Sequence, residues 1–162
     1  MTFASISNVH AHSLYGGGST TARNLAKDWS EPISTKLGSL AANRVVVDIL
    51  KVSQRPADWD DCGSLAPSKV AVACAVNAIS TFAHQVSELG LEWLHPHVGS
   101  NEIGEISFEW WRGTKKLTLY VGAEQNHYVS SWGLNIDTNM EAGILRLEDF
   151  PKQWRWLSQV HN

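Results

Sequence analysis

Two adjacent carboxylates, Asp60 and Asp61, lie in the segment of this chain that comes nearest to an active site. The segment Arg55–Pro67 contains two prolines and a glycine, so it is expected to form a loop. Carboxylates in a loop can bind a cation or act as acid and base. The same residue types also build a structural turn, in which Asp60 accepts hydrogen bonds from backbone amides, Gly63 takes a positive φ and Trp59 fills the core. We favour the structural turn, because it accounts for all of these residue types together.

Histidines supply the second candidate chemistry. His95 and His97 flank a proline, and an extended segment would place both imidazoles on one side. His127 begins a later predicted strand and would complete a three-histidine zinc site. No Cys or Glu joins these residues at a recognised metal-binding spacing, so we predict no metal and no cofactor. A small metal-dependent hydrolase built on the histidines and the Asp60–Asp61 loop is the alternative function.

Two helices are expected before the first strand. Apolar positions over residues 34–53 recur at helical spacing and predict a helix that Ser34 or Thr35 would cap. The β-branched run at 45–47 leaves a strand over 44–52 as the alternative. Residues 67–90 show the clearest amphipathic pattern in the chain and predict a long helix that ends at a glycine.

After this helix, the spacing of the apolar residues changes from a helical period to a period of two. Apolar and polar residues then alternate, which predicts strands separated by short turns. The predicted strands cover residues 106–111, 117–121 and 127–134, and a further edge strand is expected at 95–98. Residues 135–148 are expected to be irregular, and Asp149 is expected to cap a last helix over residues 150–160.

Consecutive strands joined by short turns make an antiparallel meander. The expected fold is therefore α+β, with two layers in which three to four strands pack on one long helix, and with additional N- and C-terminal helices. The chain is interpreted as a single domain over residues 1–162, with its core helix-plus-sheet unit at 57–134. Residues 1–32 are glycine-rich in part and are expected to be loosely ordered, with a short helix at 21–29 as one option.

The two faces of the predicted sheet carry different side chains and need different cover. One face would meet the long helix through the alternating residues Ile106, Phe108, Trp110, Leu117, Leu119 and Val121. The other face is expected to carry Trp111 and Tyr120, with Tyr128 or Trp132 as a further member, which is too aromatic for a plain solvated surface. Either the first or the last helix covers that second face, or a partner does.

Part of the chain resembles a diffuse group of small, functionally uncharacterised bacterial and mobile-element proteins. The resemblance covers roughly residues 57–122. It is carried by Trp59-Asp60-Asp61-Cys62-Gly63-Ser64 with a following proline and helix, then by Pro96-His97-Val98 and Gly104-Glu105-Ile106-Ser107-Phe108-Glu109-Trp110. The pattern of the group is W-D-G-x-G-[AS], so Asp61 replaces the usual glycine. The resemblance implies the order of elements and a mobile-element context, and it supplies no chemistry.

Charge and cysteine content exclude several classes of function. The formal net charge is −3, and no basic excess indicates nucleic acid or an anionic membrane as a partner. The two cysteines match neither a disulfide framework nor a zinc spacing, which favours a reducing compartment. No apolar run has the roughly 20 residues of a membrane span, and no signal peptide is expected. We therefore predict a cytoplasmic protein.

The eight tryptophans give the best interaction signal. Three of them, Trp59, Trp93 and Trp110, are assigned to the core. The predicted partner-binding residues are Trp111, Tyr120, Trp132, Trp154 and Trp156. The favoured function is a non-catalytic module that binds another protein or a second copy of itself. The resemblance makes an inhibitor of a bacterial defence system, such as an anti-CRISPR protein, or a toxin–antitoxin partner, an instance of that class.

Overall fold

The computed structural model describes residues 33–135 and 137–159, all within the unit Pro32–Asn162. The helices are α2 (Ile33–Val52), α3 (Lys69–Glu88) and α4 (Phe150–Ser158), the last preceded by a short 3-10 turn at Leu147–Asp149. The strands are β1 (His97–Ser100), β2 (Ile106–Arg112), β3 (Lys115–Val121), β4 (Asn126–Ser131) and β5 (Met140–Ile144). The option of a helix at 21–29 and the predicted order of residues 1–32 lie outside the described residues.

The five strands form one antiparallel sheet in the order β1-β2-β3-β4-β5, so each strand pairs with its neighbour in sequence. The predicted antiparallel meander is confirmed, with five strands where three to four were expected. The edge strand expected at 95–98 lies at His97–Ser100. The expectation that residues 135–148 are irregular is wrong for Met140–Ile144. This stretch lacks the aromatic and β-branched alternation of a strand, and its pairing with β4 decides its conformation.

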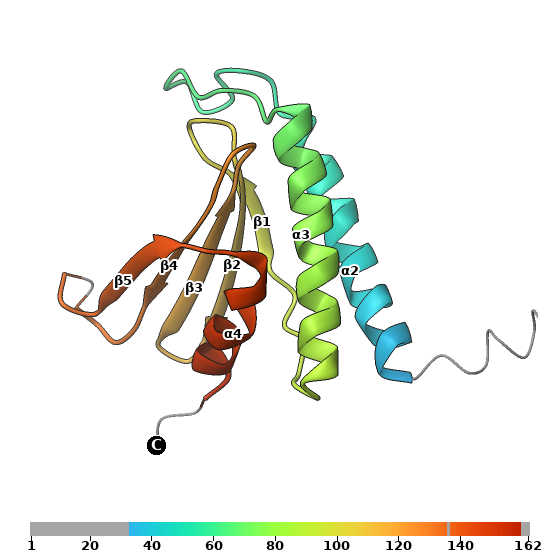
Figure 1. Ribbon diagram of the computed structural model, residues 1–162. Coiled ribbons are helices and arrows are strands. Elements are labelled where there is room, and N and C mark those ends of the chain that lie inside the picture. The colour runs from blue at the N-terminus through green and yellow to red at the C-terminus, as the bar shows by residue number, and fades with distance from the viewer. Residues whose placement is uncertain (1–32, 136, 160–162) are drawn as a thin grey trace, which may run out of the picture. The chain divides into compact units, whose positions relative to one another are not determined.

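Helix α2 is confirmed, and the strand alternative over residues 44–52 is wrong. Val45, Ile49 and Val52 are buried at helical spacing, whereas Val47, the last residue of the β-branched run, is exposed. Tertiary packing along one face of the helix therefore overrides the preference of these β-branched residues for a strand. Figure 1 shows α2 and α3 side by side along one side of the sheet.

Helix α3 begins and ends where the sequence predicts. The Ser68 side chain accepts a hydrogen bond from the Ala71 amide at 3.0 Å and caps the first turn. Gly90 follows the last turn with φ 64°, in the left-handed region that favours glycine. The buried side of α3 supplies Ala75, Ile79 and Phe82 to the core.

Helix α4 packs on the same face of the sheet as α3. Phe150 stacks on Phe82 of α3 with ring centroids 3.9 Å apart. Trp154 lies edge-on to Trp110 of β2 at 5.5 Å and stacks on Trp93 at 5.3 Å. The core thus reaches beyond the predicted unit 57–134 into α2, α4 and Leu145, which follows β5.

Trp154 is fully buried in this aromatic cluster, so its assignment to a partner-binding surface is wrong. Its indole N–H donates to the Glu92 carbonyl at 3.3 Å, which satisfies the one polar group of the side chain. Trp110 likewise donates to the Leu94 carbonyl at 2.8 Å. The core assignment of Trp110 is confirmed, whereas Trp93 is partly buried and packs against the core.

Replacing Trp154 with alanine should therefore lower the free energy of unfolding by about 3–5 kcal/mol, through lost burial and a cavity among aromatic rings. Trp111→Ala is the matched control, because the same change at an exposed tryptophan should cost at most about 1 kcal/mol. Urea denaturation followed by far-UV circular dichroism measures both. Equal losses for the two variants would contradict the arrangement of the two faces.

Candidate functional site

The sheet has one face that no helix of the described residues covers. The alternate residues of each strand that point away from α3 and α4 form this surface, which we call the open face. Its members, aligned by the strand register, are His97, Gly99, Ser107, Glu109, Trp111, Lys116, Thr118, Tyr120, His127, Val129, Ser131, Met140, Ala142 and Ile144. Within residues 33–135 and 137–159, α2 and α4 lie on the opposite face, so neither of these helices covers the open face. Tyr128 pairs with Leu119 and lies on that opposite face too, so its expected place beside Trp111 and Tyr120 is wrong.

Trp111 is the largest side chain of the open face and is 51% exposed. It pairs across the strands with Lys116, whose ammonium nitrogen lies 5.1 Å from the centre of the indole ring. The Lys116 Nζ also binds Glu109 Oε1 at 2.7 Å. The imidazole of His97 lies 6.4 Å from the Trp111 ring, and its Nδ1 is 3.8 Å from Glu109 Oε2. Charged neighbours therefore hold the indole in place while one side stays open to solvent.

Tyr120 lies farther along the open face. Its cross-strand partners are Ser107 of β2 and His127 of β4, and Ile144 of β5 follows in the same row. Tyr120 is half-buried, and Ile144 is 63% exposed. The register thus places Tyr120 and Trp111 on one surface, as the sequence predicts.

Trp132 and Trp156 do not join the open face. Their rings meet edge-on at 6.1 Å, beside the end of α4. Lys115, which points to the helix side of the sheet, places its ammonium nitrogen 5.1 Å from the Trp156 ring centre and donates to the carbonyls of Trp156 and Gln159. Cations at the C-terminus of a helix stabilise it, and burial of Lys115 lowers the pKa of its ammonium group. The two tryptophans are both half-buried, so their part in binding a partner stays a prediction.

The loop before α3 is built by its own hydrogen bonds. The carboxylate of Asp60 accepts hydrogen bonds from the Ser64 hydroxyl and from the amides of Cys62 and Ser64. The Asp58 carboxylate accepts from the Gly63 amide at 2.7 Å, and Gly63 has φ 84°. These bonds agree with the structural turn and leave Asp60 no free oxygen directed at a ligand.

Two details of this loop differ from expectation. Trp59 does not fill the core; it is 37% exposed and lies under the Arg55 guanidinium, 4.4 Å from its ring centre. Asp61 has φ 57°, in the left-handed region that glycine enters without strain.

The ionisation of Asp60 provides a test of the turn. The hydrogen bond from Ser64, first, and then those from backbone amides lower the pKa of the Asp60 carboxyl. A lowered pKa means that the ionised carboxylate stabilises the fold above its ordinary pKa of about 4, and that this stabilisation is lost as the pH falls further. Asp60→Asn should therefore be less stable than the wild type at about pH 7 and nearly equal to it at about pH 3.

Asp61→Asn serves as the control for this pH series, since Asp61 is exposed and its carboxylate accepts none of the loop hydrogen bonds described above. Urea denaturation at each pH measures the difference. A stability difference between the wild type and Asp60→Asn that does not shrink with acid would contradict the carboxylate's role.

The candidate metal ligands do not converge. His95 Nε2 pairs with Asp48 of α2 at 2.9 Å, and His97 faces Glu109. His127 lies on β4, three strands from β1, which corresponds to roughly 14 Å. No group of three or more His, Cys, Asp or Glu able to hold a metal exists among residues 33–135 and 137–159. The described part of the chain therefore offers no site for the hydrolase alternative.

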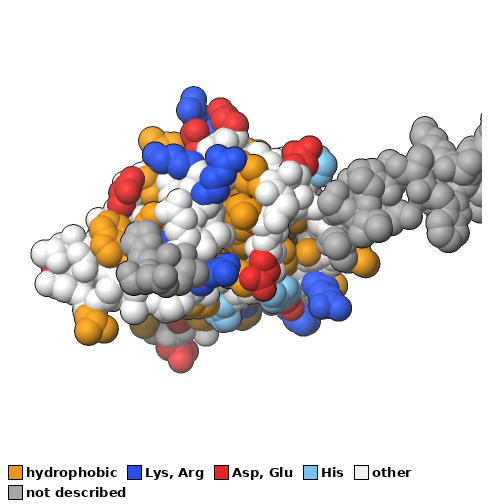
Figure 2. Space-filling model, turned by 90° about the horizontal axis from the view of Figure 1, so that it is seen from below, with side chains coloured by type: hydrophobic (Ala, Val, Ile, Leu, Met, Phe, Trp, Pro, Cys, Tyr) orange, Lys and Arg blue, Asp and Glu red, His pale blue; other side chains and the backbone are white. Residues whose placement is uncertain are grey.

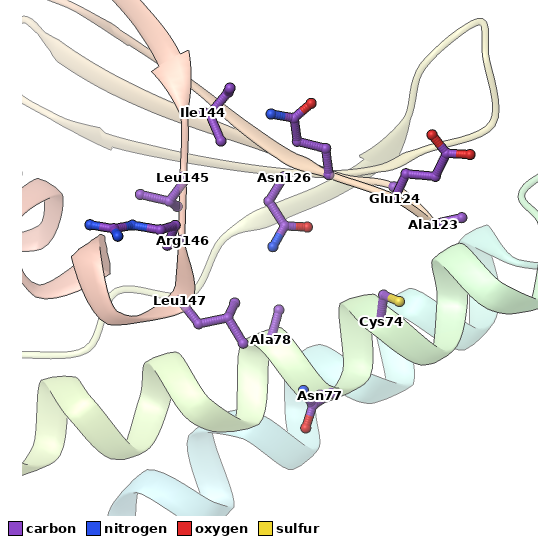
Figure 3. Close-up of a pocket in the computed structure, with 12 residues that line it drawn as sticks. Cys74, Asn77, Ala78, Ala123, Glu124, Asn126, Ile144, Leu145, Arg146 and Leu147 are labelled. Atoms are coloured by element: carbon purple, nitrogen blue, oxygen red, sulfur yellow. The ribbon is translucent and has the colours of Figure 1, made fainter.

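A groove between α3 and the sheet contains the half-buried thiol of Cys74 (Figure 3). Ala123 and Glu124 from the turn after β3, and Leu145 and Arg146 from the segment after β5, form its other walls. A cysteine nucleophile needs a base beside it to form the thiolate. No histidine lines this groove, so its lining lacks the base of a thiol active site.

Charges of both signs and apolar groups are interspersed where the molecule is seen from below in Figure 2. Such a surface lacks the single-sign field that guides nucleic acid. Comparisons with models of protein families, with curated proteins and with solved structures found no match to this chain. The function is therefore argued from the open face itself.

Proposed function

We propose that this chain is a non-catalytic module that binds another protein through the open face of its sheet. The observation that carries the proposal is Trp111, half-exposed at the centre of a network of charged side chains on a face that no described helix covers. Tryptophan and tyrosine supply a large part of the binding energy at protein interfaces, because they bury much area at a small entropic cost. Tyr120 extends this aromatic surface on the next strand.

The chemistry of the open face favours a protein over a nucleic acid. Its one lysine, Lys116, is paired with Glu109, so little positive charge is free for phosphates. Met140 and Ile144 add apolar area at the β5 side, with 52% and 63% of each side chain exposed. A core of aromatic and aliphatic groups with a rim of charged pairs is the usual composition of a protein–protein interface.

A membrane partner gains little support from the helices. The expectation that no segment reaches the length of a membrane span is wrong for α3, which alone among the described residues is long and apolar enough by length and composition. Its side chains Ile79, Phe82 and Val86 are in the core of the domain, which is the ordinary reason for such a composition. The prediction of a cytoplasmic protein stays a prediction.

Within the class of protein-binding modules, we propose an inhibitor of a bacterial defence system, of the anti-CRISPR kind, or one member of a toxin–antitoxin pair. This step rests on the resemblance of residues 57–122 to small mobile-element proteins. An inhibitor of either kind needs only an accessible surface that fits its target, and it needs no catalytic group. The open face meets that requirement.

Trp111→Ala and Tyr120→Ala test the proposal. Each should weaken capture of a partner from lysate of the source organism by about tenfold or more, as expected for aromatic residues at the centre of an interface. The captured protein is identified and quantified by mass spectrometry, and its affinity is then measured with the purified pair by calorimetry.

Trp59→Ala is the matched control, because Trp59 is also an exposed tryptophan and lies outside the open face. A partner that Trp59→Ala loses and Trp111→Ala retains would overturn the proposal. Unfolding of both open-face variants, shown by circular dichroism, would do so as well, since the face would then be part of the core.

A further inference from the structure

The sheet has two edges of different character. At one edge, β1 lies against α2, and His95 just before it pairs with Asp48 of that helix at 2.9 Å. At the other edge, β5 forms the outside of the sheet (Figure 1). Within the described residues, no strand pairs with the outer side of β5. An unpaired edge presents a row of backbone donors and acceptors to any extended chain that meets it.

β5 lacks the features that usually keep edges apart. Proteins protect free edges with lysines, prolines, bulges or charged side chains. The strand reads Met-Glu-Ala-Gly-Ile, and its one charged side chain, Glu141, accepts a hydrogen bond from the Tyr128 hydroxyl at 2.6 Å. The ring of Tyr128 lies over Gly143, where a Cβ would meet ring carbon Cε1 at 3.0 Å. Tyr128 of the neighbouring strand therefore holds both Glu141 and Gly143 of β5 in place.

The register with β4 fixes which backbone groups point outward. The Trp132 amide donates to the Asn139 carbonyl at 3.0 Å, and the Leu145 amide donates to the Asn126 carbonyl at 2.9 Å. Residues 139, 141, 143 and 145 therefore bond inward to β4, because this alternation is a property of antiparallel pairs. Met140, Ala142 and Ile144 direct their N–H and C=O groups to the free edge.

We propose that β5 pairs with β5 of a second copy of this chain, antiparallel, about a two-fold axis at Ala142. In this register Ala142 faces Ala142, and Met140 faces Ile144, so outward groups meet outward groups along the whole strand. The exposed side chains of Met140 and Ile144 become apolar cross-strand neighbours. A two-fold pair requires a strand that is complementary to itself. The sequence of β5 meets this requirement, because Met140 and Ile144 lie at equal distances on either side of Ala142.

Repulsion between like charges favours the register centred on Ala142 over the register centred on Glu141. With the axis at Ala142, Glu141 faces Gly143 of the second copy, so no two carboxylates oppose each other. An axis at Glu141 would set the two carboxylates directly opposite, which is unfavourable. It would also leave Ile144 outside the paired region. The register centred on Ala142 therefore avoids like charges and uses all of the outward hydrogen-bonding groups.

Such a pair would join two sheets into one and keep both open faces on the same side, because a two-fold axis perpendicular to a sheet preserves its faces. The pairing uses the edge of the sheet and leaves Trp111 and Tyr120 free. The inference is therefore independent of the proposed function, and a dimer would present two copies of the open face to a partner.

Sedimentation velocity over a range of micromolar concentrations tests the dimer. The wild type should reach twice the chain mass of 17.9 kDa. The double variant M140K/I144K sets lysine opposite lysine across the axis and should remain at the chain mass. The double variant M140K/I144E sets lysine opposite glutamate and should recover the doubled mass, because residue 140 faces residue 144 only in the proposed register.

A second pair of variants tests the backbone contacts. Ala142→Pro removes an N–H that points outward and is not used within the sheet, so it should weaken the dimer by about tenfold or more while leaving the fold intact. Ala142→Ser keeps that N–H and should dimerise as the wild type does. A wild type that sediments at the chain mass at every concentration overturns the proposal. Equal masses for M140K/I144K and M140K/I144E also overturn it, as does unchanged dimerisation of Ala142→Pro.

Discussion

The contact of α4 with Trp110 determines which surface of this molecule is available. Trp110 presents its indole on the helix side of β2, where Phe150 and Trp154 of α4 meet it, and Phe150 in turn stacks on Phe82 of α3. Since α2, α3 and α4 are all held on that side, the opposite side of the sheet is left without a helix in the described residues. The neighbouring residue Trp111 then faces outward, because successive strand residues point to opposite faces. The core face and the open face of the sheet thus follow from one pair of adjacent tryptophans.

Much of this arrangement was predictable from periodicity. The spacing of apolar residues in α3 and their alternation in β2 and β3 define the helix, the two strands and the core face between them. The side of the sheet that α4 would choose was not predictable, because both sheet faces carry aromatic residues. Trp154 and Trp156 lie two apart on a short helix, and only the tertiary contacts show that the first is buried and the second half-buried. Strand β5 was missed because its pairing, and not its composition, makes it a strand.

In the loop before α3, the local sequence pattern specifies the hydrogen bonds and the backbone conformation of the turn, but not the position of Trp59. Asp60 gathers amide and hydroxyl donors, as residue types alone suggest, and Asp61 takes a backbone conformation suited to glycine. The position of Trp59 was not predictable from the pattern, because its ring packs against the Arg55 guanidinium and not in the core. The sequence alone could not show that the three candidate histidines are far apart. The strand order shows it, because β2 and β3 lie between His127 on β4 and the segment of His95 and His97.

The meander connectivity has a kinetic consequence. Every strand pairs with its neighbour in sequence, so the sheet can form by successive closure of short loops, each with a small entropic cost. Topologies with such local contacts fold faster than those that join distant segments. The helices pack on the sheet through more distant contacts, and α4 reaches β2 and α3 only after the whole meander has been passed along the chain. Until α4 docks, the Trp110 indole lacks the contacts of Phe150 and Trp154, so the time between sheet formation and docking sets how long this aromatic surface is exposed to aggregation.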